Sequence, residues 1–132
     1  WIHNTTTSIF KNHLGDVYTY NQTLGTEINF LIENLRVVYS GVKCGNINKE
    51  VFIPDHALAL SDLVKEDIIR IELSKQDALK FLNKTITNID SPKNGWHLAT
   101  YKNLGLGWIK NMGSRINNYF PVEWRIRMDI KD

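Results

Sequence analysis

The chain has 132 residues, enough for one domain with a substantial hydrophobic core and no need for metal or disulfide staples. Hydrophobic residues make up 42% and charged residues 23%, and no apolar run approaches the roughly 18 residues that a membrane-spanning helix needs. The formal net charge of +2 by itself indicates no class of partner.

The first residues carry neither the cationic nor the apolar region of a secretory signal. Since the chain opens on Trp1 and continues into a polar threonine run, we expect it to be a fragment of a longer polypeptide. Its one cysteine, Cys44, cannot form an internal disulfide, which favours a reducing compartment. The expected location is therefore the cytoplasm, with no membrane partner.

The beginning of the chain is predicted to form a hairpin and then a helix. Residues 9–11 and 17–20 are short β-prone runs joined by a turn-rich link. Apolar residues at helical spacing predict one apolar face on a helix over residues 24–34, with Thr23 or Thr26 as its cap.

The middle of the chain is predicted to alternate between strands and short helices. Residues 36–42 are rich in β-branched side chains and predict a buried strand, followed by a bend around Cys44. Asp55 is a good cap for a short apolar helix over the next residues. Residues 69–73 alternate like a strand, and residues 74–82 begin with a serine cap and continue as a helix.

The last part of the chain is predicted to be mostly β structure. Residues 96–101 and 104–110 can pair as a hairpin around a two-residue turn. Residues 115–120 and 122–128 predict one or two further strands, separated by Pro121, which cannot donate a ladder hydrogen bond. The order of elements indicates an α+β fold: a mostly antiparallel sheet or pseudo-barrel with two or three short helices.

Basic and aromatic residues are concentrated in this last part. Residues 101–127 hold five Lys or Arg side chains against one acid, a net charge of +4 that leaves −2 for the rest of the chain. The interleaved aromatic residues are Trp96, Tyr101, Trp108, Tyr119, Phe120 and Trp124. Because rings stack on bases and cations hold phosphates, the segment predicts a nucleic-acid-binding surface. The alternatives are a solvated strand face that happens to be basic, and aromatic packing in a sheet core.

The sequence shows little sign of catalysis. It has no glycine-rich phosphate loop, no Cys-x-x-Cys pair and no two histidines at metal-ligand spacing on a helix. Asp55 and His56 are the best acid–base pair, but adjacent side chains point in different directions and Asp55 is expected to cap a helix. Lys43 could lower the pKa of Cys44, yet no base adjoins that thiol in sequence. We therefore expect structural roles for these residues.

Four short motifs follow one another between residues 52 and 125. They are FIPDHALAL at residues 52–60, DALKFL at 77–82, GWHLATY at 95–101 and LGWIKNMGSRINNYFP at 106–121. In this order they resemble the C-terminal PUA-like domain of RsmF-type RNA 5-methylcytosine methyltransferases, the Sun family, whose closing signature reads LGWGK…GGRLKNHYP. Ile109, Ser114 and Phe120 depart from that signature.

The resemblance implies a PUA-like fold for residues 51–132. Residues 1–50 are expected to form an α/β portion that packs on the same unit. It implies that the chain binds ribosomal RNA for its own methyltransferase domain, located elsewhere in the protein and holding S-adenosylmethionine and the catalytic cysteines. The chain itself is then expected to be a monomer without enzymatic activity. One alternative is a module that docks on a protein domain without contacting RNA. Another is a small enzyme that uses Asp55, His56 and Cys44.

Eight residues are the predicted RNA contacts. Basic and amide side chains are expected to contact phosphate, sugar or base edges, and Trp108 or Tyr119 to stack on a base. The eight are Lys102, Trp108, Lys110, Arg115, Asn117, Asn118, Tyr119 and Arg125. No catalytic residue and no metal ligand is predicted.

Overall fold

A computed structural model describes residues 1–2, 7–12, 14–86, 88–90, 93–128 and 130. The chain divides into two compact units, Ile2–Leu63 and Val64–Asp132, and Trp1 belongs to the second. The sequence-based division after residue 50 falls inside a strand hairpin of the first unit. That the two portions pack as one compact domain stays a prediction.

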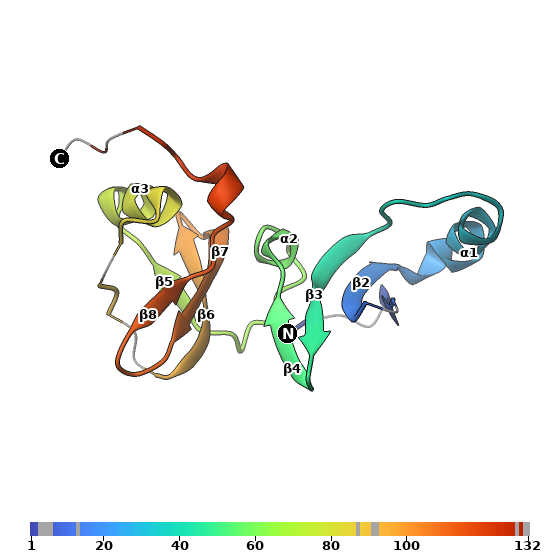
Figure 1. Ribbon diagram of the computed structural model, residues 1–132, viewed down its shortest axis with the longest axis horizontal. Helices are drawn as coiled ribbons and strands as arrows, with labels where there is room; N and C mark the ends of the chain where they lie inside the picture. Colours follow the sequence, from blue (N-terminus) through green and yellow to red (C-terminus); the bar gives the residue numbers. More distant parts are fainter. Residues whose placement is uncertain (3–6, 13, 87, 91–92, 129, 131–132) are drawn as a thin grey trace. The chain divides into compact units, whose positions relative to one another are not determined.

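Four antiparallel strands form the sheet of the N-terminal unit (Figure 1). β1 (Thr7–Lys11) and β2 (Asp16–Asn21) make the predicted hairpin, and β3 (Val42–Asn48) and β4 (Val51–Pro54) follow in order. The register between β2 and β3 shifts so that Cys44 has no direct partner. The bend expected at Cys44 is therefore a bulge within one continuous strand.

A helix, α1 (Gly25–Asn34), forms where apolar spacing predicted one, after the 3-10 turn η1 (Gln22–Leu24). The predicted caps were wrong: no side chain caps α1, and Asn21 instead caps η1 by accepting a hydrogen bond from the Thr23 N–H at 3.0 Å. No residue of α1 is buried. The apolar spacing thus predicted the helix correctly, but the apolar face that it indicated is not buried.

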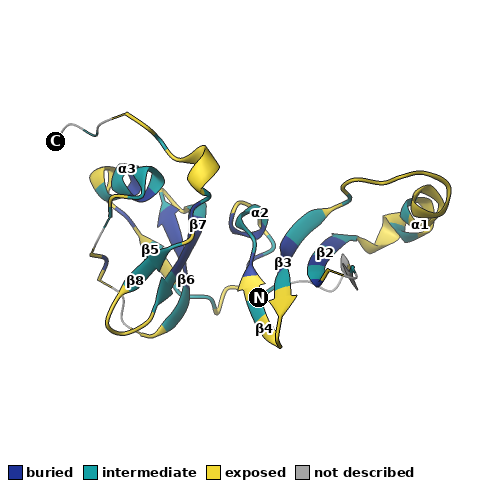
Figure 2. Cartoon of the chain, viewed as in Figure 1, coloured by how far each residue is buried: buried dark blue, intermediate teal, exposed yellow. Residues whose placement is uncertain are grey.

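The segment after α1 is exposed and irregular, so the buried strand predicted over residues 36–42 was wrong. Val38 is 88% exposed, and β3 starts only at its last residue, Val42. Figure 2 shows exposed residues along α1 and this segment. β-branched residues favour extended backbone, but in the described part of the chain no neighbouring strand pairs with the segment before Val42.

The short helix α2 (His56–Ala59) begins where it was predicted. The carboxylate of Asp55 accepts a hydrogen bond from the Ala57 N–H at 2.9 Å, which satisfies one of the donors at the helix start. Leu58 and Ala59 are buried. This helix joins the core of the N-terminal unit, as its composition indicated.

The C-terminal unit is a four-stranded mixed sheet with one helix on one face (Figure 1). β5 (Arg70–Glu72) runs parallel to β6 (Gly95–Tyr101), and β7 (Leu104–Asn111) and β8 (Ile116–Asn118) follow in antiparallel order. β5 is parallel to β6 because α3 (Lys75–Asn83) lies on the crossover between them. The α+β class predicted from the sequence is confirmed.

The core of this unit lies between α3 and the sheet. Ser74 caps α3 as predicted, since its Oγ accepts a hydrogen bond from the Asp77 N–H at 3.1 Å and donates one to the Asp77 carboxylate at 2.7 Å. The buried apolar residues are Leu73, Ala78, Phe81, Ile89, Ala99, Ile109 and Phe120.

The last segment of the chain passes the end of α3 instead of adding a strand. Residues 122–124 form a 3-10 turn, η2 (Val122–Trp124), and the Ile126 N–H donates to the Leu82 carbonyl at 3.1 Å. The strand predicted over residues 122–128 was therefore wrong. Lys84, at the end of α3, donates from Nζ to the carbonyl oxygens of Asn118 and Phe120, at 3.0 and 2.7 Å.

We expect Ser74→Ala to lower the free energy of unfolding by about 1 kcal/mol, because the alanine leaves the Asp77 N–H without its cap. Thermal and urea unfolding followed by circular dichroism measure this. Thr26→Ala is the matched control, since α1 has no side-chain cap to lose. An equal loss in both variants would contradict the role of Ser74.

Candidate nucleic-acid interface

The face of the C-terminal sheet that points away from α3 carries a row of aromatic and polar side chains. The register places Trp96 of β6, Lys110 of β7 and Asn117 of β8 beside one another on this face. Tyr119 lies two residues beyond Asn117 and points the same way, with its ring centroid 4.5 Å from that of Trp96. We call Trp96, Lys110, Asn117 and Tyr119 the outer row.

The cation of the outer row lies against one of its rings. Lys110 Nζ is 5.1 Å from the centroid of the Trp96 ring, a cation–π contact. Tyr119 is 38% exposed, and the Trp96 ring packs against it nearly edge-on, at an interplanar angle of 62°. The row therefore offers an exposed aromatic ring beside a positive charge held in place.

Trp108 points to the same face but lies inside the structure. It is 1% exposed, and the ring of Trp1 packs edge-on against it with a centroid distance of 5.6 Å. Trp1 also contacts Trp96 at 6.3 Å. No face of the Trp108 ring is open to a base, so the expectation that Trp108 stacks on RNA is corrected. The same expectation for Tyr119 stays a prediction.

Two other predicted contacts, Asn118 and Arg125, lie on the α3 side of the sheet. Asn118 Nδ2 donates to the Phe81 carbonyl at 2.7 Å, and its Oδ1 accepts from the Phe120 N–H at 2.8 Å. Its amide therefore joins α3 to the sheet and is not available to RNA, a second correction. Arg125 is exposed and follows η2, beside the end of α3.

Lys102 lies at the other end of the β6–β7 hairpin from Lys110, roughly 17 Å away along the strand. It forms the predicted tight turn with Asn103, and both have positive φ, 51° and 63°, as in a type I′ turn. The Glu72 carboxylate accepts hydrogen bonds from both backbone N–H groups and from Thr100 Oγ1. These hydrogen bonds, that of Thr100 foremost, lower the pKa of Glu72.

Arg115 lines a polar cavity of about 380 Å³ beside the β7–β8 turn. Gly113 makes this turn possible with a φ of 84°, and its N–H donates to Asn111 Oδ1 at 2.8 Å. The other residues that line the cavity are Asn88, Ile89, Asp90, Asn111, Gly113, Ser114 and Ile116. Arg115 is thus near the outer row in sequence but belongs to a separate cavity.

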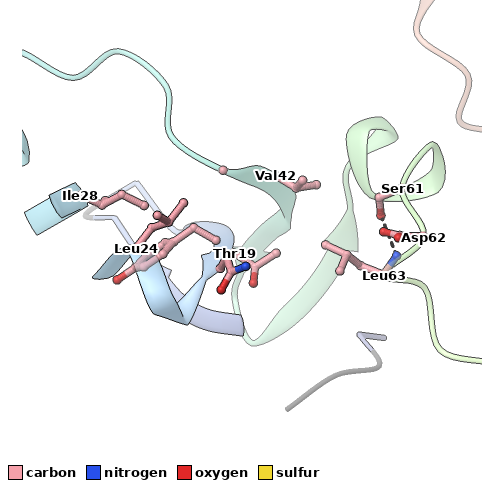
Figure 3. A pocket seen from close by; sticks show the side chains of 10 residues that line it. Thr19, Leu24, Ile28, Val42, Ser61, Asp62 and Leu63 are labelled. Atoms are coloured by element: carbon pink, nitrogen blue, oxygen red, sulfur yellow. Dashed lines mark hydrogen bonds between the residues drawn. The ribbon is translucent and has the colours of Figure 1, made fainter. Parts of the chain in front are cut away.

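The N-terminal unit holds an apolar cavity of about 440 Å³ (Figure 3). Leu24, Ile28, Val42 and Leu63 line it, and Asp62 is the charged side chain among its lining residues. Such a lining attracts no phosphate, so this cavity does not suit the RNA backbone.

The residues considered for catalysis have structural environments. Burial raises the pKa of the Cys44 thiol to about 11, which keeps it neutral, and Lys43 pairs with Asp16 at 3.0 Å. The expectation that Lys43 lowers the pKa of Cys44 was therefore wrong. Burial also lowers the pKa of His56, beside the capping Asp55.

The described residues show neither a metal site nor a membrane-spanning helix. They contain no group of three or more side chains placed to hold a metal ion. None of the helices in the described ranges has the length and apolar character needed to cross a membrane.

The C-terminal unit has the architecture of an α+β PUA-like domain: a mixed sheet, one helix over one face and the outer row on the other. Residues 69–126 match the family model of the PUA domain of the methyltransferase RsmF. The sequence of this segment is thus similar to the PUA domain of RsmF, as its motifs indicated. A search of curated proteins gave no match. The matched segment contains the whole outer row and Arg115.

Trp96 is the outer-row residue that the predicted contacts did not include. Its alternation with Leu98 and Thr100 along β6 puts all three on the face away from α3, but the sequence left core packing open as an alternative for the aromatic residues of this segment. The pairing of Trp96 with Lys110 could have identified Trp96 as a member of the outer row. That pairing depends on the register between β6 and β7.

We expect Glu72→Gln to remove an acid-sensitive part of the stability. Because the folded-state pKa of Glu72 is lowered, its stabilisation is present above the unfolded-state pKa, about 4.3, and is lost as pH falls through the folded-state value. The difference in melting temperature between the native chain and the variant should shrink as pH falls from 7 to 3. Glu66→Gln controls for the loss of a charge. A difference that stays constant with pH would contradict this.

Proposed function

We propose that the chain is an RNA-binding domain that positions ribosomal RNA for a cytosine-5 methyltransferase domain of the same protein. The match of residues 69–126 to the RsmF PUA family supports the proposal. The observation that carries it is the outer row, where the exposed Tyr119 ring lies beside Trp96 and Lys110 on one face of the sheet.

Each member of the outer row has a plausible task in RNA binding. Tyr119 offers a ring on which an unstacked base can lie, supported from the side by Trp96. Lys110 brings a cation to the phosphate beside that base. Asn117, next to Lys110 in the register, can hydrogen-bond to a sugar or base edge. Such a surface binds single-stranded or looped RNA better than a regular duplex, whose bases are stacked.

In this proposal the chain contributes binding and orientation, and the chemistry belongs to another domain. S-adenosylmethionine would supply the methyl group there, together with the catalytic cysteines. The residues of this chain would hold the RNA so that its target base reaches that domain. The protein would act as a monomer in the cytoplasm.

We expect Tyr119→Ala to weaken binding to single-stranded RNA about tenfold, because stacking of one base contributes roughly 1–3 kcal/mol. Lys110→Ala should reduce the slope of log K against log salt concentration by about 0.7, as one phosphate contact is lost. Fluorescence anisotropy with a labelled single-stranded fragment of ribosomal RNA measures both.

Two matched variants control for these changes. Phe30→Ala removes an exposed ring in the N-terminal unit, and Lys75→Ala removes an exposed cation at the start of α3. Neither should alter affinity by more than a small factor. If Tyr119→Ala and Lys110→Ala bind RNA like the native chain at low salt, the outer row is not the RNA-binding surface.

A second candidate function, docking on a protein domain, is favoured by the N-terminal unit. Phe30 and Leu35 are 64% and 62% exposed, and Val38 follows them on the same exposed segment (Figure 2). Apolar exposure of this extent is typical of an interaction surface. The partner in this alternative is the methyltransferase domain of the same protein.

The double variant Phe30→Ser/Val38→Ser tests the docking function. If the segment docks, the variant should associate more weakly with a separately expressed methyltransferase domain while keeping its affinity for RNA. Calorimetric titration of one domain into the other measures the association. Equal association of variant and native chain would exclude this segment as the docking surface.

A further inference from the structure

The polar cavity beside the β7–β8 turn is lined by no residue of the outer row. Its volume of about 380 Å³ is in the range of small-ligand pockets, roughly 300–1,000 Å³. Ile89 and Ile116 supply apolar lining, and Ile89 is buried. The exposed polar side chains that line it are Asn88, Asp90, Ser114 and Arg115. A mostly polar cavity with two apolar lining residues suits a flat ring that carries hydrogen-bonding groups.

Hydrogen bonds fix the turn on one side of this cavity. The Met112 N–H donates to the Arg115 carbonyl at 2.9 Å, and the Gly113 N–H donates to Asn111 Oδ1 at 2.8 Å. Asn111 Nδ2 donates to the Lys93 carbonyl at 3.0 Å, which ties the turn to the loop before β6. The Asn111 amide is therefore committed to the structure, and recognition is left to the other polar side chains, of which Asp90 and Arg115 are charged.

Asp90 and Arg115 bring opposite charges to the cavity without pairing with each other. Among the described residues neither side chain has a hydrogen bond or an ion pair, and no ion pair within 4.0 Å joins them. A phosphate would be attracted by Arg115 and repelled by Asp90. A neutral ligand with both donors and acceptors can satisfy both groups.

Guanine is the RNA base whose hydrogen-bonding groups match this pair. It has two adjacent donors, N1–H and the N2 amino group, which a carboxylate can accept together, and two adjacent acceptors, O6 and N7, for an arginine fork. Adenine and cytosine have one amino group each and no adjacent ring N–H. Uracil has a single N–H between two carbonyl oxygens. Only guanine can give both charged side chains a two-bond contact.

We propose that this cavity binds the guanine base of a single-stranded RNA, with Asp90 and Arg115 as its specificity-determining residues. The inference deepens the proposed function and rests on it. Lys110 of the outer row and Asn111 of the cavity are consecutive residues of β7. Their side chains point to opposite faces of the sheet, but the cavity lies beside the β7–β8 turn, where β7 ends. In this proposal one RNA chain passes around that turn, with one nucleotide stacked on Tyr119 and a nearby guanine in the cavity.

Binding of RNA hexamers to the 132-residue chain tests the proposal. The probes are a fluorescein-labelled hexamer of uridines and three copies in which one uridine becomes guanosine, adenosine or cytidine. We expect the guanosine hexamer to bind about tenfold more tightly than the uridine hexamer, the discrimination that one bidentate base contact provides. The adenosine and cytidine hexamers should bind like the uridine hexamer.

Two conservative variants locate this preference in the cavity. Arg115→Lys keeps the charge but loses the planar fork, and Asp90→Asn replaces one acceptor of the pair by a donor. In each variant, the dissociation constant of the uridine hexamer divided by that of the guanosine hexamer should fall to near one. Asp67→Asn, which removes an exposed carboxylate outside the cavity, should leave the ratio unchanged. Circular dichroism melts check that every variant folds.

The outcomes separate this inference from the proposed function. Equal binding of all four hexamers by the native chain would overturn the guanine site and leave RNA binding intact. The guanine site would also be overturned if Asp90→Asn bound every hexamer more tightly while the ratio of the uridine and guanosine dissociation constants stayed the same. That result would indicate a phosphate site, since loss of the carboxylate removes repulsion of any phosphate. Binding of no hexamer at all would overturn the proposed RNA function, and the guanine site with it.

Discussion

One extra residue in β7 decides which side chains of the C-terminal sheet face α3 and which face away. The register between β6 and β7 shifts between Ala99 and Thr100, so that Leu106 has no direct partner. Beyond the shift the alternation of β7 is reversed. Ile109 therefore packs in the core, and Lys110 turns to the opposite face against the ring of Trp96. Without the extra residue Lys110 would point at α3, so the core and the proposed binding surface depend on the same irregularity.

Local chemistry made much of the C-terminal unit predictable from the sequence. The Ser74 cap and the Lys102–Asn103 turn each depend on a few neighbouring residues, and both are present. The shift in register has no such local signal. If β6 and β7 are paired residue by residue from the turn without the extra residue, Trp96 lies opposite Ile109. In the structure Trp96 lies opposite Lys110. This is why composition and charge could indicate a candidate surface in this part of the chain, but could not predict which of its side chains share one face of the sheet.

The remaining errors arise where burial depends on a distant partner. Asn117 and Asn118 are identical side chains in adjacent positions, yet one lies in the outer row and the other bonds to the backbone of α3. Trp108 is buried partly because Trp1 packs on it from the other end of the sequence. In the N-terminal unit, the apolar residues of α1 follow a helical period but remain exposed. A periodic pattern reports the shape of an element, and only the tertiary structure determines what covers it.

The contact of Lys84 with β8 also limits how the sheet can grow. β8 is an edge strand of its sheet. An edge strand presents unpaired backbone N–H and carbonyl groups, to which a strand of another molecule can add. The Tyr119 N–H bonds to the Trp108 carbonyl, so by alternation the backbone groups of Asn118 point away from β7, toward that open edge. Lys84 Nζ bonds to the Asn118 and Phe120 carbonyls there. The Lys84 ammonium group therefore occupies two carbonyl acceptors at this sheet edge that an incoming strand would need. This protects the domain against strand addition by other molecules and against aggregation.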